Sequence, residues 1–129
     1  MDTIIAKEDQ FSAEVQNDFI HLKTWGRLEL DNLDAPVNAA ITLAQDKSID
    51  KLLDDIREVD TSDVSLHVQA KGMSVLWKLR TFRKVAIVFK GREIGMLLFS
   101  SLEALHLHLD SRFKGFDNEA EAIKWLEED

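Results

Sequence analysis

A continuous apolar run at residues 85–89, Val-Ala-Ile-Val-Phe, is the feature of this sequence that most constrains its fold. The run is long enough for a strand and far too short to span a membrane. Consecutive side chains of a strand point to opposite sides, so an unbroken apolar run needs cover on both faces. It therefore predicts the buried middle of a mostly parallel sheet with helices packed against it.

Segments with strand-like and helix-like periodicity alternate along the rest of the chain. The strand-like segments are residues 11–15, 19–25, 51–59, 84–89 and 112–116. The helix-like segments are residues 34–44, 64–79, 92–109 and 119–126. The first two strands are separated by a short polar cluster and predict an antiparallel hairpin. Together the pattern predicts one α/β domain over residues 1–129, with a four- to five-stranded mostly parallel sheet, an antiparallel edge hairpin and four helices.

Two helix starts and a core follow from the same pattern. Asp34 is expected to be an N-cap, with Pro36 in the first turn. Asn118, with Glu121 three residues later, forms a capping-box signal for the last helix. The predicted core contains Val85, Ile87, Phe89, Leu98, Leu102, Leu105, Ile123 and Leu126.

The composition excludes several classes of function. The chain has 129 residues and no cysteine, so disulfides, thiol catalysis and cysteine-ligated metals are excluded. It has 16 basic and 24 acidic side chains, for a net charge of −8, which argues against a general nucleic-acid binder. No signal-peptide pattern and no membrane-spanning run are visible, so we expect a soluble, cytoplasmic protein.

The positive charge is concentrated in one part of the chain. Residues 71–92 carry seven basic side chains and no acidic one. This basic strip is a candidate contact for an anion or for an acidic partner, although solvent-facing charges of this kind are also common without a ligand. The candidate contact residues are Lys71, Lys78, Arg80 and Arg83.

No catalytic or metal-binding signature stands out. Asp54 and Asp55 are adjacent in a strand and must lie on opposite faces, so they cannot form a carboxylate pair. One of them is expected to face a charge partner such as Arg57 or Lys51. His106 and His108 are two residues apart on a predicted helix and lie on nearly opposite sides of it. We therefore expect no enzyme activity, no catalytic residue, no cofactor and no metal site.

Four stretches of the sequence resemble the STAS domain, the sulphate transporter and anti-sigma factor antagonist domain, in its bacterial SpoIIAA-like branch. They are Trp-Gly-Arg-Leu at residues 25–28, the strand ending in aspartates at residues 51–57, the buried strand at residues 83–88, and the Phe, acidic, Ala and Trp-Leu pattern of residues 116–126. The resemblance spans residues 19–126. It implies an α/β fold of the kind grouped with the CRAL-TRIO lipid-transfer fold.

In STAS antagonists, a serine that follows the central strand is a phosphorylation switch within an Asp-Ser-Ser-Gly motif. The corresponding residues 60–65 are Asp-Thr-Ser-Asp-Val-Ser, without the glycine. The resemblance makes Ser62 the first candidate for a phospho-switch, followed by Thr61 and Ser65. The same hydroxyls also suit N-capping of the next helix, and this alternative stays open.

The resemblance and the missing catalytic motifs predict a non-enzymatic regulatory or binding module that docks on a regulatory protein partner. The helix after the central strand, with Ser62, Ser65 and Lys71, is the expected docking surface. The alternative is a small carrier of a lipid or another hydrophobic anionic ligand, which the relation to lipid-transfer domains and the basic strip suggest. A second copy of the chain is a further candidate partner.

Overall fold

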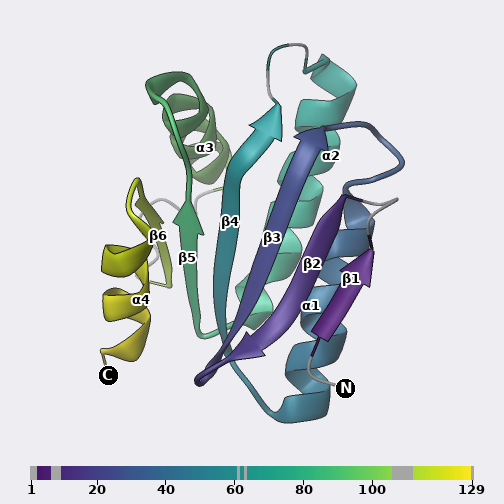
Figure 1. The fold of residues 1–129 in the computed structure, drawn as a ribbon. Coiled ribbons are helices and arrows are strands. Elements are labelled where there is room, and N and C mark those ends of the chain that lie inside the picture. Colours follow the sequence, from purple (N-terminus) through teal and green to yellow (C-terminus); the bar gives the residue numbers. More distant parts are fainter. Residues whose placement is uncertain (1–2, 7–9, 61, 63, 106–111, 129) are drawn as a thin grey trace.

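Six strands form one mixed sheet in the computed structural model of the chain, which describes residues 3–6, 10–60, 62, 64–105 and 112–128. The strands follow their sequence order across the sheet (Figure 1). They are β1 (Thr3–Ala6), β2 (Phe11–Gln16), β3 (Phe19–Arg27), β4 (Lys51–Asp60), β5 (Lys84–Val88) and β6 (Phe113–Phe116).

The sheet divides into an antiparallel part and a parallel part. β1, β2 and β3 pair antiparallel, whereas β3 to β6 pair parallel. The β2–β3 turn contains Asn17 at φ 55°, a left-handed conformation that asparagine tolerates better than most residues. The predicted fold class is confirmed, and β1 adds one more strand at the antiparallel edge. Only Ile4 and Ile5 give that short strand an apolar signal, which is too little for a pattern.

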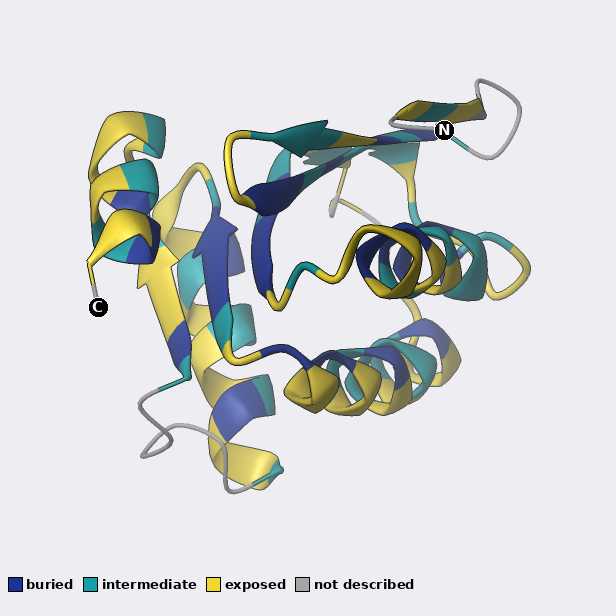
Figure 2. Ribbon diagram, turned by 90° about the horizontal axis from the view of Figure 1, so that it is seen from below, coloured by how far each residue is buried: buried dark blue, intermediate teal, exposed yellow. Residues whose placement is uncertain are grey.

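Four helices cover the sheet unequally. α1 (Asp34–Lys47), α2 (Leu66–Lys78), continued by the 3₁₀ turn η1 (Leu79–Thr81), and α3 (Arg92–Ala104) lie on one side, and α4 (Glu119–Glu127) packs on the other (Figures 1 and 2). The strand order explains this division. Right-handed crossovers that always advance to the next strand place their helices on the same face. α4 follows the last strand, so it can return to the opposite face.

Of the two predicted helix caps, the one at Asn118 is confirmed and the one at Asp34 is wrong. Asn118 caps α4, because its side-chain oxygen accepts a hydrogen bond from the Glu121 N–H at 3.1 Å. Asp34, in contrast, is not a cap: Leu33 occupies the cap position without a side-chain bond, and α1 begins at Asp34. The carboxylate of Asp34 instead binds the ammonium groups of Lys71 and Lys78 on α2, at 2.8 and 3.1 Å.

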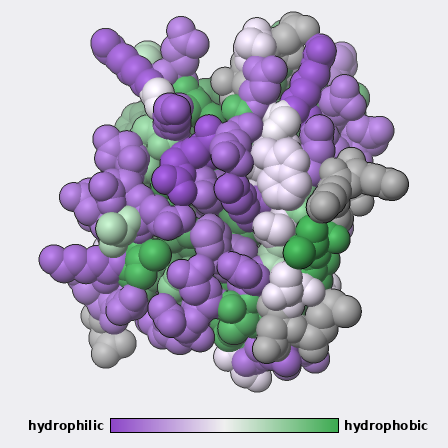
Figure 3. All heavy atoms as spheres, in the orientation of Figure 1, coloured by the Kyte–Doolittle hydropathy of each residue, from purple (hydrophilic) through white to green (hydrophobic). Residues whose placement is uncertain are grey.

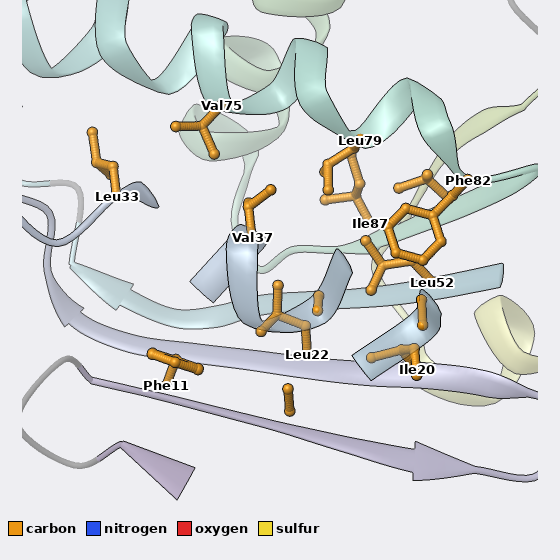
Figure 4. Close-up of a cluster of buried hydrophobic side chains, with 14 of the residues drawn as sticks. Phe11, Ile20, Leu22, Leu33, Val37, Leu52, Val75, Leu79, Phe82 and Ile87 are labelled. Carbon is orange, nitrogen blue, oxygen red and sulfur yellow. The ribbon is translucent and has the colours of Figure 1, made fainter. Parts of the chain in front are cut away.

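Two apolar layers hold the helices to the sheet. Ile20, Leu22, Leu52 and Ile87 lie in the layer under α1 and α2 (Figure 4). Phe19, Leu53, Ala86 and Val88 lie in the layer under α4, together with Ala122 and Leu126. The apolar run at residues 85–89 is thus covered on both faces over its β5 part, as its sequence predicts.

All eight residues of the predicted core are at least partly buried. Val85, Ile87, Leu102 and Leu126 are buried, and Phe89, Leu98, Leu105 and Ile123 are half-buried. The third helix ends at Ala104 rather than at residue 109, and residues 106–111, with His106 and His108, lie outside the described residues. Leu98 stays partly accessible because it lines the pocket described next.

Candidate functional site

An apolar pocket of about 200 Å³ lies between the sheet and the three helices of its first face. The sheet contributes Leu22, Asp54 and Ile87, and the helices contribute mainly apolar side chains, among them Val75 from α2 and Leu98 from α3. Thr24, Gln69 and Ser101 add a few hydroxyl and amide groups to the lining. Apolar walls with a small number of polar groups are the usual composition of a small-molecule site.

The inward face of α2 explains why there is space in the pocket. Val68, Gly72, Val75 and Leu79 recur at helical spacing and share one face of the helix. Gly72 lines the pocket, and a Cβ atom built on it would meet no other atom within 4 Å. A larger side chain at position 72 would occupy part of the pocket, and glycine leaves that space empty.

Asp54 is the unusual residue of this pocket. The alternation of β4 turns Leu52, Asp54 and Ile56 toward the helices, and the neighbours of Asp54 in register are Leu22 on β3 and Ile87 on β5. In the described part of the chain, the Asp54 carboxyl takes part in no side-chain hydrogen bond or ion pair. Burial, together with the negative charge of Asp55, raises its pKa from 3.8 to about 7.

Among the described residues that line the pocket, Asp54 is the one ionisable side chain. No cation in this lining offsets its charge, and no donor in the described chain satisfies its oxygens. Asp54 is half-buried and lines the pocket, and a carboxyl held among apolar side chains without a partner is costly. The pocket therefore offers an incoming molecule an apolar wall and one unsatisfied acceptor group. The sequence pattern predicted no site here, although an acidic residue inside a buried strand was a usable signal.

Asp55 belongs to a different cluster on the opposite face of the sheet, under the start of α4. The Arg57 guanidinium binds both Asp55 oxygens, at 3.0 and 2.8 Å, and also the Glu119 carboxylate at 3.1 Å. Burial alone would raise the pKa of Asp55, but the hydrogen bonds from the Arg57 side chain and backbone N–H lower it below its ordinary value. The predicted charge partner Arg57 is confirmed for this aspartate.

His21 completes this cluster. Its Nε2 atom lies 4.0 Å from Asp55 Oδ2 and 3.7 Å from Glu119 Oε1, while its Nδ1 atom is 2.9 Å from Gln16 Oε1. His21, Asp55 and Glu119 are a donor set that a divalent cation could use. However, the Arg57 guanidinium already binds both carboxylates, so the cluster contains its own cation. The sequence pattern did not point to His21 and Glu119, because only the pairing of β3 with β4 and the position of α4 bring them together.

The candidate phospho-switch lies at the end of β4 and the start of α2. Ser65 is the N-cap of α2, since its hydroxyl accepts a hydrogen bond from the Val68 N–H at 3.2 Å. Ser62 is exposed, and its backbone N–H donates to Asp60 Oδ1 at 2.9 Å. Thr61 lies outside the described residues. Capping thus accounts for Ser65, and phosphorylation of Ser62 stays a prediction.

The basic strip does not converge on the pocket. Lys71 and Lys78 both bind Asp34, Arg83 binds Asp50 at 3.0 Å, and the Arg80 guanidinium lies 4.4 Å from the centre of the Trp77 ring. None of these four residues lines the pocket. Lys71 and Lys78 share one carboxylate, whereas Arg83 pairs with a different one. A contact with an anion or a partner stays a prediction for all four residues.

The face that carries α4 has a different surface character from the pocket. The space-filling view from this side shows mainly hydrophilic side chains (Figure 3).

In the described residues, no helix is both long and apolar enough to cross a membrane.

Comparison with known proteins is informative about the fold. No family model matches the sequence, and no curated protein matches it. The fold is similar to that of an uncharacterized protein of the DUF3478 family with a SpoIIAA-like fold from Shewanella loihica PV-4, with a TM-score of 0.56 and 22% sequence identity. The match covers 90% of this chain and 91% of that one. At this identity the likeness concerns the fold alone: the chain has the SpoIIAA-like fold that its sequence resembled.

Proposed function

We propose that this protein is a binding module whose pocket between the sheet, α2 and α3 holds a small, largely apolar molecule. The observation that carries the proposal is the pocket itself, with its apolar walls and the open space at Gly72. A non-enzymatic role fits a SpoIIAA-like fold, which is typical of non-catalytic STAS-like modules.

The volume limits the size of the cargo. An engineered cavity of about 150 Å³ takes up benzene, whereas drug-sized ligands occupy about 300–1,000 Å³. A pocket of about 200 Å³ lies between these cases. It suits a molecule built on one ring or a short chain rather than a whole membrane lipid. Because its one ionisable lining residue in the described chain is an acid, the pocket also favours a cargo other than the hydrophobic anion considered above.

A leucine at position 72 tests the proposal directly. Gly72→Leu places a side chain into the space that the pocket leaves open, and it replaces a helix-interior glycine with a better helix former. We expect this variant to fold and to lose cargo. Ser74→Leu adds the same side chain to an exposed position of the same helix and should keep it.

The measurement is native mass spectrometry of freshly purified protein, followed by titration of the wild type and both variants with toluene. A bound mass or a toluene-dependent rise in melting temperature in the wild type and Ser74→Leu, but not in Gly72→Leu, supports the proposal. Equal behaviour of all three proteins would show that the pocket is not the binding site.

Docking on a protein partner is the second candidate function, and one exposed residue favours it. Leu66, in the first turn of α2, is 81% exposed and close in sequence to Ser62 and Ser65. An apolar side chain at such exposure next to a candidate phosphorylation site suits a contact that a phosphate would disrupt.

Capture from the native cell with matched variants tests this candidate. Leu66→Ser and Ser62→Asp should fold normally and lose a partner that the wild type and Ser62→Ala both retain. If Ser62→Ala and Ser62→Asp both capture the same partner as the wild type, the switch hypothesis should be abandoned.

A further inference from the structure

The Asp54 carboxyl in the pocket accepts no hydrogen bond from any described group of the protein. Its neighbours in register are apolar, Leu22 on β3 and Ile87 on β5, and the pocket that it lines is mainly apolar, with the uncharged polar side chains Thr24, Gln69 and Ser101 among the lining residues. The nearest charged group in sequence, Asp55, is an acid that points to the other face of the sheet and binds Arg57 there. Nothing described in the protein therefore completes the hydrogen bonding of the Asp54 carboxyl.

We propose that Asp54 is the recognition group of the pocket, and that the cargo is an apolar molecule with one hydrogen-bond-donating group, a hydroxyl or an ammonium, that reaches this carboxyl. This inference rests on the proposed function, because it names the chemistry of the molecule that the pocket holds. It makes the pocket selective by head group as well as by size.

The chemistry of a carboxyl explains the preference for donors. An ionised carboxylate only accepts hydrogen bonds, so a hydroxyl or an ammonium satisfies it and another carboxylate does not. The protonated form can still exchange hydrogen bonds with a hydroxyl, whose oxygen also accepts. With a pKa near 7, both forms of Asp54 are present at neutral pH, and a hydroxyl suits either one. An ammonium suits only the ionised form, so its binding should strengthen as the pH rises through neutrality.

A matched set of four probes separates head group from apolar shape. Toluene, benzyl alcohol, benzylamine and benzoate share one ring and differ in the group attached to it. We expect benzyl alcohol and benzylamine to bind the wild type at least about tenfold more tightly than toluene or benzoate do, as a satisfied buried acceptor requires. Isothermal titration calorimetry measures the affinities, and methyl NMR shifts of Val75 and Ile87 show that binding occurs in the pocket.

Three variants assign the preference to one carboxyl. Asp54→Leu should bind toluene as tightly as benzyl alcohol. Asp54→Asn keeps an acceptor oxygen but not the charge, so it should retain benzyl alcohol and lose the preference for benzylamine. Asp55→Asn changes the adjacent residue on the opposite face and should leave the order of the four probes unchanged.

The outcomes separate this inference from the proposed function. If the wild type binds toluene in the pocket but binds the two donors no better, or if Asp54→Leu keeps the preference, the inference is overturned while the pocket remains a binding site. If none of the four probes shifts the pocket methyl signals, both the inference and the proposed function fail.

Discussion

Asp54 and Asp55 are neighbours on one strand, yet the two faces of the sheet treat them in opposite ways. Asp55 lies under α4, where Arg57 binds both of its oxygens and lowers its pKa. Asp54 lies under α2 and α3, where the described chain provides no partner and its pKa rises to about 7. The same residue type is thus a structural ion pair on one face and an unsatisfied group in a pocket on the other. Polar groups inside proteins are nearly always hydrogen-bonded, so a carboxyl without a partner needs an explanation. A perturbed pKa in a cleft is a marker of functional sites.

The comparison predicts that replacing Asp54 has the largest effect on stability. The raised pKa means that the folded state holds the Asp54 proton more tightly than the unfolded state does. Stability from this group is therefore complete below about pH 4 and is lost as the pH rises from there through about 7, by about 4 kcal/mol. At about pH 8, Asp54→Asn should unfold at a higher free energy than the wild type by a similar amount, because the buried charge is gone.

Urea denaturation of both proteins across this pH range provides the measurement. At about pH 4 the two free energies of unfolding should be close, since the wild-type carboxyl is then neutral as well. A wild type whose stability does not fall between about pH 4 and pH 8, or an Asp54→Asn variant that is no more stable at the upper end, would contradict the burial of an unpartnered carboxyl.

Asp55→Asn should lower the free energy of unfolding, which is the opposite of the effect of Asp54→Asn, and the change should be somewhat smaller. The lowered pKa means that this carboxylate stabilises the fold above its ordinary pKa and that this stabilisation disappears as the pH falls below it. Near neutral pH the variant should lose about 2 kcal/mol, because the negative charge that Arg57 binds is gone and an NH2 group replaces one of the two oxygens that accept its hydrogen bonds.

The same denaturation experiment measures this loss, with Glu58→Gln as the control. Glu58 pairs with Lys23 at the surface, 3.2 Å away, and removing such a pair should cost less than about 0.5 kcal/mol. An Asp55→Asn variant as stable as Glu58→Gln at neutral pH would mean that the ion pair under α4 contributes nothing measurable.

The two faces also differ in how far the sequence predicted them. The apolar run at residues 85–89 predicted a strand covered on both sides, and Asn118 with Glu121 predicted the start of α4. Both signals are local, so residue pattern alone was enough. The alternation of β4 likewise placed Asp54 and Asp55 on opposite faces. The residue pattern could not predict which of the two aspartates would find a hydrogen-bond partner.

That outcome depends on contacts between distant segments. The cluster around Asp55 needs His21 from β3 and Glu119 from α4, which only the strand pairing and the return of α4 bring together. The pocket around Asp54 needs the distance that α2 and α3 keep from the sheet, and a single glycine, Gly72, contributes to it. Asp34 was assigned to a cap for the same reason, since its lysine partners lie on another helix.

The smallest predicted effects come from the two helix caps, one on each face. Ser65→Ala removes the hydroxyl that caps α2 over the pocket, and Asn118→Ala removes the side chain that caps α4 beside the Asp55 cluster. Each should cost about 1 kcal/mol of unfolding free energy, because one first-turn N–H loses its partner. Their local consequences should differ, however. Fraying of α2 disturbs Val68 and Gln69 in the pocket lining, so Ser65→Ala should weaken the binding of benzyl alcohol, whereas Asn118→Ala should leave it unchanged. Calorimetric titration of both variants checks this difference, and an equal loss of benzyl alcohol binding in the two would mean that the faces do not act as separate units.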